Sequence, residues 1–357
     1  MFKRGCHRPS RCLRGLIGLM MSHATSWIVL LFLIFTVSVP TTLSDYTPVF
    51  DGDQAMAYLT AQCDFGPRPP GSANLSLCRE YIVQNVASYG WNVTLQNFTY
   101  LGVECANIVV RWGSADNASI LLGAHYDTRP RADQDPDPAN RSRPVLGAND
   151  GASGTAVLTE LSHSIPEADR GNVEMVFFDA EDSGNINGWE WIVGSSHYAE
   201  QLSAERRQAI RAMVLLDMVG GAGLRLARET SSTLSLQDTV WSMAGQMGYG
   251  STFLNVAGRG IIDDHAPFLN LRIPSLDIIE HDPFPSTWHT LQDTPEECNA
   301  TSLEIVGRVV ESFVVYHGGD NARFPLDNPI GMYVAVVLGL SVLAAITLLL
   351  ARRRLSR

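Results

Sequence analysis

The chain has 357 residues, 45% hydrophobic and 18% charged, which is long enough for one large domain or two small ones. Acidic residues outnumber basic ones by 37 to 26, and nine of the basic residues lie in 1–44 and 352–357, where no acidic residue occurs. Residues 45–351 therefore carry a formal charge of about −20. Such a surface repels phosphate backbones, which disfavours a nucleic-acid-binding role.

The N-terminal 44 residues have the pattern of an export signal. Five basic residues precede an uncharged apolar run over 27–39, and small residues follow near Pro40. This pattern predicts a signal peptide or a signal anchor over 1–44, and the sequence leaves its cleavage open.

The next segment alternates between strand-like and helix-like patterns. Apolar runs and period-two alternation predict strands at 91–100, 106–112, 119–124, 173–178, 212–216 and 273–279. Helical spacing predicts helices at 53–62, 77–89, 152–162, 203–211, 234–247 and 302–316. The segments 65–72 and 129–143 are predicted as a rigid turn and a loop. Strands that alternate with helices predict a single three-layer α/β domain over 45–329, with a central mixed, largely parallel sheet.

Residues 330–351 are apolar, uncharged and long enough to cross a bilayer, and three arginines, 352–354, follow at once. By the positive-inside rule this pattern predicts a transmembrane helix at 330–351 and a basic cytoplasmic tail at 352–357. The domain 45–329 is then expected to be membrane-anchored and extracytoplasmic, at the cell surface or in a lumen.

Sequons and cysteines fit an exported glycoprotein domain. The sequons begin at Asn74, Asn92, Asn97, Asn117, Asn140 and Asn299. Outside the leader the cysteines are Cys63, Cys78, Cys105 and Cys298. Export permits disulfides, and Cys63–Cys78 is the closest pair in sequence, with the connectivity otherwise open. There is no Cys-x-x-Cys pair, so a thiolate zinc site is not expected.

Polar clusters follow the predicted strands. They are His125-Tyr126-Asp127, Asn149-Asp150-Gly151, Asp179-Ala180-Glu181-Asp182, Asp217, Asp263-Asp264-His265 and Trp288-His289. Because the carboxyl ends of parallel strands meet at one edge of a sheet, we expect these clusters to converge. Imidazoles and carboxylates together are zinc ligands, so the clusters predict a zinc site.

Each cluster alone also has a structural interpretation. Asp150 before a helix is typical of an N-cap, and Asp264-His265 has the same relation to the next helix. The other clusters suit solvated turns or, for Trp288-His289, surface packing. Their joint occurrence at successive strand ends favours a common site.

In these motifs the chain resembles the zinc-dependent family that unites secreted leucyl-type aminopeptidases with glutaminyl-peptide cyclotransferases of animals and bacteria. The resemblance runs from the Gly66-Pro67-Arg68 turn to the helix after His289. Asp-Asp-His-x-Pro-Phe-Leu and Pro-Phe-Pro-x-x-Trp-His-Thr look like the cyclotransferase branch. Aminopeptidases of the family usually show Ser-Asp-His and Tyr-His instead.

The resemblance implies roles for individual residues. Asp150, Asp182 and His289 match the three ligands of the cyclotransferase zinc, and Glu181 matches the catalytic acid/base. Asp217 and Asp264 match a hydrogen-bonded carboxylate pair beside the substrate. The implied substrate pocket consists of Trp288, Phe284 and either Trp189 or Trp191. In two-metal aminopeptidases the second zinc would use His125 and Asp217, with Asp150 bridging.

The chain departs from the family at one ligand. Both branches commonly have Glu-Glu where this chain has Glu181-Asp182. Asp is a competent oxygen ligand but shorter than Glu, so the metal must lie closer to the backbone or bind differently.

The implied reaction is the conversion of an N-terminal Gln of a peptide or protein to pyroglutamate with release of ammonia, with one zinc ion. The alternative is a two-zinc aminopeptidase that removes N-terminal residues. A catalytically silent, membrane-anchored receptor or adhesion module is a third possibility, disfavoured because the carboxylates and His289 are all present.

Overall fold

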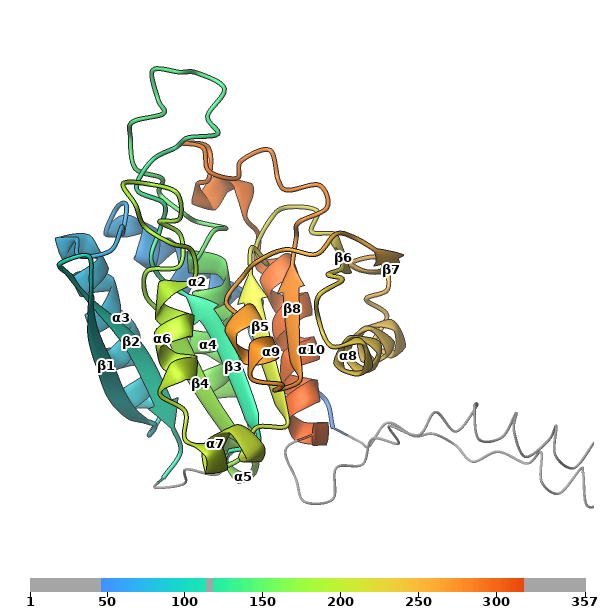
Figure 1. The fold of residues 1–357 in the computed structure, drawn as a ribbon. Helices are drawn as coiled ribbons and strands as arrows, with labels where there is room; N and C mark the ends of the chain where they lie inside the picture. Colours follow the sequence, from blue (N-terminus) through green and yellow to red (C-terminus); the bar gives the residue numbers. More distant parts are fainter. Residues whose placement is uncertain (1–45, 114–117, 318–357) are drawn as a thin grey trace, which may run out of the picture. The chain divides into compact units, whose positions relative to one another are not determined.

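The computed structural model describes residues 46–113 and 118–317 (Figure 1). The predicted leader at 1–44, the predicted membrane helix at 330–351 and the tail at 352–357 lie outside the described residues. Over the two described ranges, no helix combines the length and the apolar character needed to span a membrane. Residues 47–113 and 118–317 belong to one compact unit.

The unit is built on a six-stranded sheet with the order β1-β2-β4-β3-β5-β8. In chain order the strands are β1 (Asn92–Tyr100), β2 (Val103–Arg111), β3 (Ile120–His125), β4 (Val173–Phe178), β5 (Ala212–Asp217) and β8 (Ser275–Ile279). Strands β4, β3, β5 and β8 run parallel, whereas β1 pairs antiparallel with β2 and β2 with β4. The predicted mixed, largely parallel sheet is therefore confirmed. A second, two-stranded sheet joins β6 (Leu226–Arg228) to β7 (Phe253–Ala257).

Helices cover both faces of the large sheet, which gives the predicted three layers (Figure 1). The helices packed in the larger core are α2 (Gly52–Asp64), α3 (Ala73–Ser88), α4 (Ala152–Ser164), α8 (Leu234–Gln246) and α10 (Ala300–His317). The helices that contribute to the smaller core on the opposite face are α6 (Val193–Glu200) and α9 (Ala266–Asn270). The remaining short helices of the described residues are α5 (Glu167–Arg170), α7 (Ala204–Ala209) and η1 (Pro295–Glu297).

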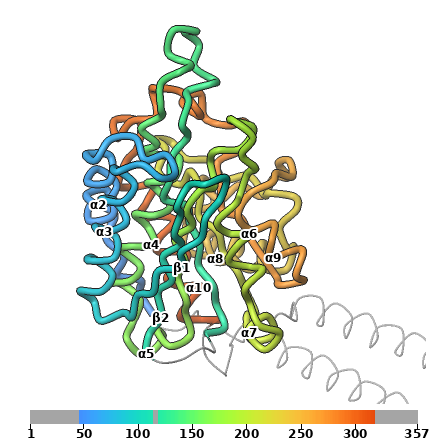
Figure 2. The backbone as a smooth tube through the Cα atoms, turned by 60° about the vertical axis from the view of Figure 1, so that its left-hand side comes forward, coloured from blue at the N-terminus to red at the C-terminus, as the bar shows by residue number. Residues whose placement is uncertain are grey.

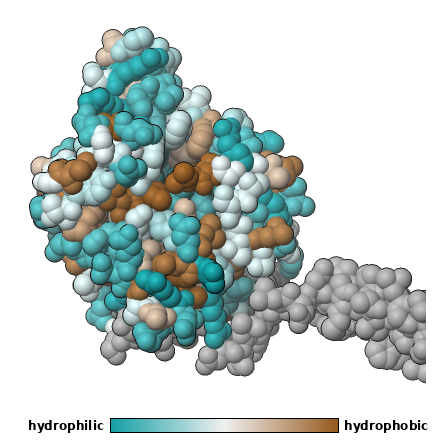
Figure 3. Space-filling view, viewed as in Figure 1, coloured by the Kyte–Doolittle hydropathy of each residue, from teal (hydrophilic) through white to brown (hydrophobic). Residues whose placement is uncertain are grey.

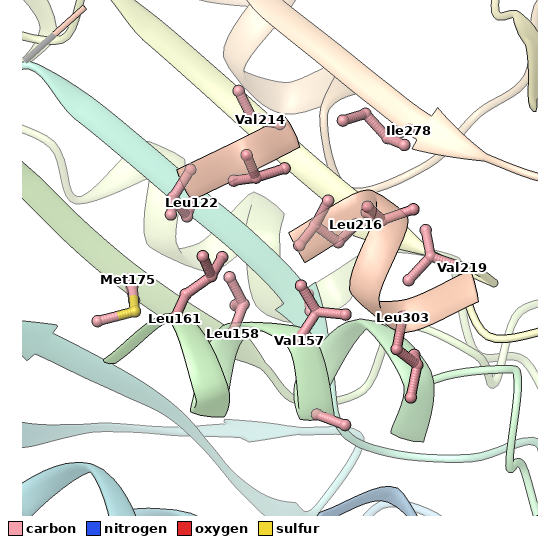
Figure 4. Close-up of a cluster of buried hydrophobic side chains, with 14 of the residues drawn as sticks. Leu122, Val157, Leu158, Leu161, Met175, Val214, Leu216, Val219, Ile278 and Leu303 are labelled. Carbon is pink, nitrogen blue, oxygen red and sulfur yellow. The ribbon is translucent and has the colours of Figure 1, made fainter. Parts of the chain in front are cut away.

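The two cores follow from the period-two geometry of the strands, because successive side chains point to opposite faces. In β5, Val214 and Leu216 belong to the larger core, whereas Met213 and Leu215 belong to the smaller one. Figure 4 shows Leu122, Val214, Leu216 and Ile278 from three parallel strands facing α4 side chains. Fully apolar strands such as these are typical of a parallel sheet buried on both sides.

Three features were not expected from the sequence. Helix α6 follows an N-cap residue, Ile192, that makes no side-chain cap hydrogen bond, so the usual start signal is missing. The β6–β7 sheet consists of strands of three and five residues. Finally, the pairing Cys63–Cys78 is not formed: both are buried free thiols, as are Cys105 and Cys298.

The loop predicted at 129–143 is confirmed, because this segment between β3 and α4 forms neither helix nor strand. In Figures 1 and 2 it rises above the carboxyl ends of the parallel strands as a long green projection. Figure 3 shows that this projection is mostly hydrophilic. It lies above the edge of the sheet at which the predicted site residues gather.

Candidate metal and catalytic site

The parallel strands deliver polar residues to one edge of the sheet. His125 and Asp217 are the last residues of β3 and β5, and Glu181 and Asp182 follow the end of β4. Asp150 comes just before α4, which starts directly beside the end of β3. The predicted convergence of these residues is what the register of the parallel strands produces.

Glycines allow the start of α4 to lie against the strand ends. A Cβ atom at Gly151 would lie 2.6 Å from Cε1 of His125, and one at Gly154 would lie 2.1 Å from the carbonyl oxygen of Leu216. Both distances are below any real contact, so only glycine fits. The N-cap of α4 is Gly151, without a side-chain cap. Asp150 is therefore not the capping residue, and its side chain is free to face the site.

Asp150, Asp182 and His289 form the first ligand group. They are buried, and one potential ligand atom of each lies within 4.8 Å of the others. Nε2 of His289 is 3.1 Å from Oδ1 of Asp182 and 3.6 Å from Oδ2 of Asp150. Oδ2 of Asp182 is buried and has no hydrogen-bond partner. Two carboxylates and one imidazole around one point, with an unsatisfied oxygen, fit a divalent metal ion.

His125, Asp150 and Asp217 form the second ligand group, under the same distance criterion. Nε2 of His125 is 3.1 Å from Oδ1 of Asp217 and 3.2 Å from Oδ1 of Asp150. Burial opposes protonation of His125, but the neighbouring carboxylates, Asp217 foremost, raise its pKa well above the ordinary value. Asp150 faces both groups, which is the placement required of a bridging ligand.

Two carboxylates outside the predicted set hold the backbone of the ligand residues. Asp127 accepts hydrogen bonds from the N–H groups of Glu181 and Asp182, at 3.0 and 3.2 Å. Asp293 accepts from the N–H groups of Asn149 and Asp150, at 2.7 and 3.1 Å. Asp127 was visible in the sequence as the first acid after β3, in the cluster His125-Tyr126-Asp127. Asp293 carries no signal in its local sequence.

The backbone at the site is held in an unusual conformation. Ala180, Met218 and His289 have φ angles of 61°, 45° and 56°, in the left-handed region. Such conformations cost about 1–3 kcal/mol each in residues other than glycine and cluster at functional sites. One of these residues is a candidate ligand, and the other two adjoin Glu181 and Asp217.

Glu181 and Asp264 are buried acids next to the ligand groups. Burial raises the pKa of Glu181 well above its ordinary value, His125 opposes this, and the charges of Asp182, Asp263 and Asp264 add to it. Burial, followed by the charge of Asp263, likewise raises the pKa of Asp264. Burial among like charges therefore favours the protonated form of both groups.

The implied hydrogen bond between Asp217 and Asp264 is not present. Asp217 is instead drawn to His125, and both carboxylate oxygens of Asp264 lack a hydrogen-bond partner. An imidazole between carboxylates attracts Asp217 more strongly than a second acid does, which is the physical reason for the difference.

A second buried polar cluster is centred on His265, and its other two members, Glu229 and Asp277, were not named from the sequence. Nε2 of His265 is 3.4 Å from Oε2 of Glu229, and its Nδ1 is 3.5 Å from Oδ2 of Asp277. All three residues are fully buried. Asp277 did carry a signal, because it is the one charged residue of strand β8 and lies between apolar residues.

Aromatic rings line the site on the side of His289. The indole of Trp288 stacks on the imidazole of His289 with centroids 3.7 Å apart, and on Phe284 with centroids 4.4 Å apart. The two alternatives for the further Trp separate in the structure. Trp191 lies parallel to His289 at 6.1 Å, whereas Trp189 packs against Tyr100, in a hydrophobic cluster with Phe98 and Val193.

Comparison with known proteins agrees with this geometry. The sequence profile of Peptidase family M28 matches residues 107–314. Among curated proteins, the glutaminyl-peptide cyclotransferase of Drosophila melanogaster is 24% identical over 285 residues, covering 70% of this chain and 77% of that protein. The glutaminyl-peptide cyclotransferase-like protein of Mus musculus is 25% identical over 287 residues, covering 71% and 72%.

Solved structures of both activities are similar to the chain. A Bacteroides thetaiotaomicron glutaminyl cyclase bound to N-acetylhistamine has a TM-score of 0.70 and 34% identity, covering 75% of this chain and 99% of that one. A Zn-dependent exopeptidase from Parabacteroides distasonis has a TM-score of 0.70 and 33% identity, with the same coverage.

Proposed function

The chain belongs to peptidase family M28, and from this membership we propose that it is a zinc-dependent glutaminyl-peptide cyclotransferase. Its substrate would be a peptide or protein with an N-terminal Gln, and its products pyroglutamyl peptide and ammonia. The observation that carries the proposal is the similarity to glutaminyl cyclases in both sequence and structure, over 70% and 75% of the chain.

The site has the parts that this acyl transfer needs. Asp150, Asp182 and His289 would hold one zinc ion, which when bound acts as a Lewis acid toward the side-chain carbonyl of the substrate Gln. Glu181 is the buried acid beside these ligands, and its raised pKa suits a group that both takes and returns a proton.

In the proposed reaction the substrate's own α-amine attacks its γ-carbonyl carbon. Glu181 accepts the proton of the attacking amine and donates it to the departing nitrogen. One carbon–nitrogen bond forms in the lactam, the side-chain carbon–nitrogen bond breaks, and ammonia leaves. Asp264, buried beside Glu181, would hold a proton and form one hydrogen bond with the reacting amine, as donor or as acceptor.

The aromatic wall would bind the small substrate side chain. Trp288 and Phe284 form one stack against His289, and Trp191 lies parallel to the same imidazole. Apolar walls of this kind exclude water, which would otherwise give simple deamidation.

One observation favours a second candidate, a two-zinc aminopeptidase. The group His125, Asp150 and Asp217 provides a second set of ligands that shares Asp150 with the first. Glu181 would then activate a water molecule for attack on the first peptide bond.

Ammonia release separates the two candidates. The purified protein, supplied with zinc, would be offered Gln-initiated and Leu-initiated peptides, with the products identified by mass. We expect ammonia and an intact cyclised peptide from the Gln series. Free amino acid without ammonia would instead establish the aminopeptidase.

Export and membrane attachment of the domain remain proposals that rest on the sequence alone. The apolar runs at 27–39 and 330–351 and the six sequons support them. Protease protection of the intact chain in membrane vesicles would test the placement of the domain.

A further inference from the structure

Four side chains form a closed ring that includes two of the three residues in the first ligand group. In order around the ring they are Arg129, Asp182, His289 and Asp133. NH1 of Arg129 is 3.3 Å from Oδ1 of Asp182, which is 3.1 Å from Nε2 of His289. Nδ1 of His289 is 3.6 Å from Oδ1 of Asp133. The two carboxylate oxygens of Asp133 accept hydrogen bonds from Arg129 at 2.7 and 2.8 Å, which closes the ring. We call this set the Arg129 ring.

Arg129 is fixed in the ring on every side. It is 3% exposed, and its NH1 also donates to the carbonyl oxygens of Asp182 and Gly184, at 3.2 and 3.3 Å. Its Nε and NH2 make a two-pronged contact with Asp133. The guanidinium lies 4.7 Å from the ring centroid of Trp191. A planar fork held in this way fixes both carboxylates that it contacts.

The loop that carries Arg129 and Asp133 is also attached to the chain around His289. The N–H of Gln134 donates to the carbonyl oxygen of His289 at 3.2 Å. The N–H of Leu291 donates to the carboxylate of the buried Asp135 at 3.0 Å. The position of Asp133 relative to the imidazole is therefore set by backbone contacts at His289 itself and two residues after it.

The Arg129 ring contains the contacts that orient two side chains of the first ligand group, Asp182 and His289. A metal-binding imidazole is usually oriented by a carboxylate at its other nitrogen, and Asp133 faces Nδ1 of His289. Asp182 is shorter than the Glu that commonly stands in its place, and Arg129 contacts both its carboxylate and its carbonyl. Arg129 thus holds the short ligand from the side opposite to His289.

We propose that Arg129 and Asp133 are positioning residues for metal binding: Arg129 fixes Asp182, and Asp133 fixes the orientation of His289. The inference rests on the proposed function only in requiring that this group binds a metal ion. It is independent of whether the reaction is cyclisation or peptide hydrolysis.

Two variants of Arg129 distinguish a positioning role in metal binding from an effect of its positive charge alone. Removing a cation close to a metal site should tighten metal binding by Coulomb's law. Removing a positioning group should weaken it, about 10- to 100-fold for outer-shell residues of metal sites. Arg129→Met deletes charge and fork together, whereas Arg129→Lys keeps the charge and loses the fork.

The measurement is the zinc dissociation constant of the full chain, from competition with a chromophoric chelator. We expect weaker binding in Arg129→Lys, Arg129→Met and Asp133→Asn, each by about 10-fold or more. Arg143→Met is the matched control, because Arg143 is exposed on the same loop and, within residues 46–113 and 118–317, its side chain donates only to Asn140. Circular dichroism of the zinc-free proteins checks that each variant is folded.

Unchanged zinc affinity in Arg129→Lys and Asp133→Asn, or tighter binding in Arg129→Met, would overturn the inference. If Arg129→Met does not fold, Arg129→Lys and Asp133→Asn still decide it. A parent chain that binds zinc but releases no ammonia contradicts the cyclotransferase proposal and leaves this inference standing. A parent chain that binds no zinc contradicts both.

Discussion

Oδ1 of Asp150 lies 3.2 Å from Nε2 of His125, so a carboxylate of the first ligand group also belongs to the second. This shared residue is the structural link between the one-zinc and the two-zinc mechanisms. The zinc content of the chain and its dependence on His125 therefore report on the reaction.

His125→Gln tests this link. In the cyclotransferase the variant should bind as much zinc as the parent, one ion per chain, because His125 is outside the first ligand group. Metal analysis of both proteins after gel filtration gives the stoichiometry. Two ions in the parent and one in the variant would favour the aminopeptidase.

Glu181→Gln should lower kcat by at least about 10²–10⁴-fold, the usual contribution of a general acid/base, because the amide cannot accept the proton of the attacking amine. Zinc affinity should change little, since Glu181 is not in either ligand group. Glu190→Gln is the control variant, because Glu190 is an exposed glutamate further along the same segment. Full turnover in Glu181→Gln would exclude both proposed mechanisms.

The two candidate tryptophans can be compared directly. Trp191→Leu removes the ring that lies parallel to His289, so the KM for Gln-initiated peptides should rise, by about 10- to 200-fold if an apolar contact of about 1–3 kcal/mol is lost. Trp189→Leu removes packing against Tyr100 and should lower stability without changing KM. Steady-state kinetics and thermal melts of the pair give the answer. A KM effect in Trp189→Leu alone would reverse the assignment.

Removal of zinc should lower the melting temperature. The site brings the buried acids Asp150, Asp182, Asp217, Glu181 and Asp264 close together, and a bound cation offsets their repulsion. Zinc at about 1,000 times its dissociation constant adds about 4 kcal/mol, or roughly 8–16 °C for a domain of this size. Calorimetry with chelator and with zinc restored measures the shift. An equal melting temperature in both states would argue against a metal at these residues.

Asp179 gives a pH dependence of stability away from the ligands. Burial, followed by the charge of Asp127, raises the pKa of Asp179 to about 7. The folded state then binds more protons than the unfolded state between pH 4 and 7, so this group lowers stability as pH rises through that window. The loss is at most about 4 kcal/mol, for three pKa units.

Asp179→Asn should remove this dependence. The amide oxygen can still accept from the N–H of Ala106 and the hydroxyl of Tyr126. Denaturant unfolding at pH 4.5 and 8 compares the two proteins, and the variant should gain stability relative to the parent only at the higher pH. A gain of equal size at both pH values would contradict the assignment of the shift to this carboxyl.

The sequence predicted the sheet and its active edge because both depend on local patterns. An apolar run that ends in an acid, as at Asp217, indicates both the strand and the residue at which it ends. A parallel arrangement then brings such ends together without further information. The ligand groups therefore emerged from residues that were already named.

The surroundings of the ligands were not predictable in the same way. Asp293 holds Asp150 across 143 residues of chain, and Arg129 reaches Asp182 across 53. Such contacts depend on how loops fold back, which no local period encodes. The same reason explains why the sequence could not choose between Trp189 and Trp191, which differ by two positions in an irregular segment.

The hydrogen bonds from Asn149 and Asp150 to Asp293 have a consequence for synthesis of the protein on the ribosome. The segment that carries His289 and Asp293 is among the last of the domain to emerge, long after β3, β4 and α4 have left the exit tunnel. A nascent chain can form the central strands early, but it lacks one candidate ligand and the support of another until that segment docks. The candidate site is therefore complete only after the end of the domain has been synthesised.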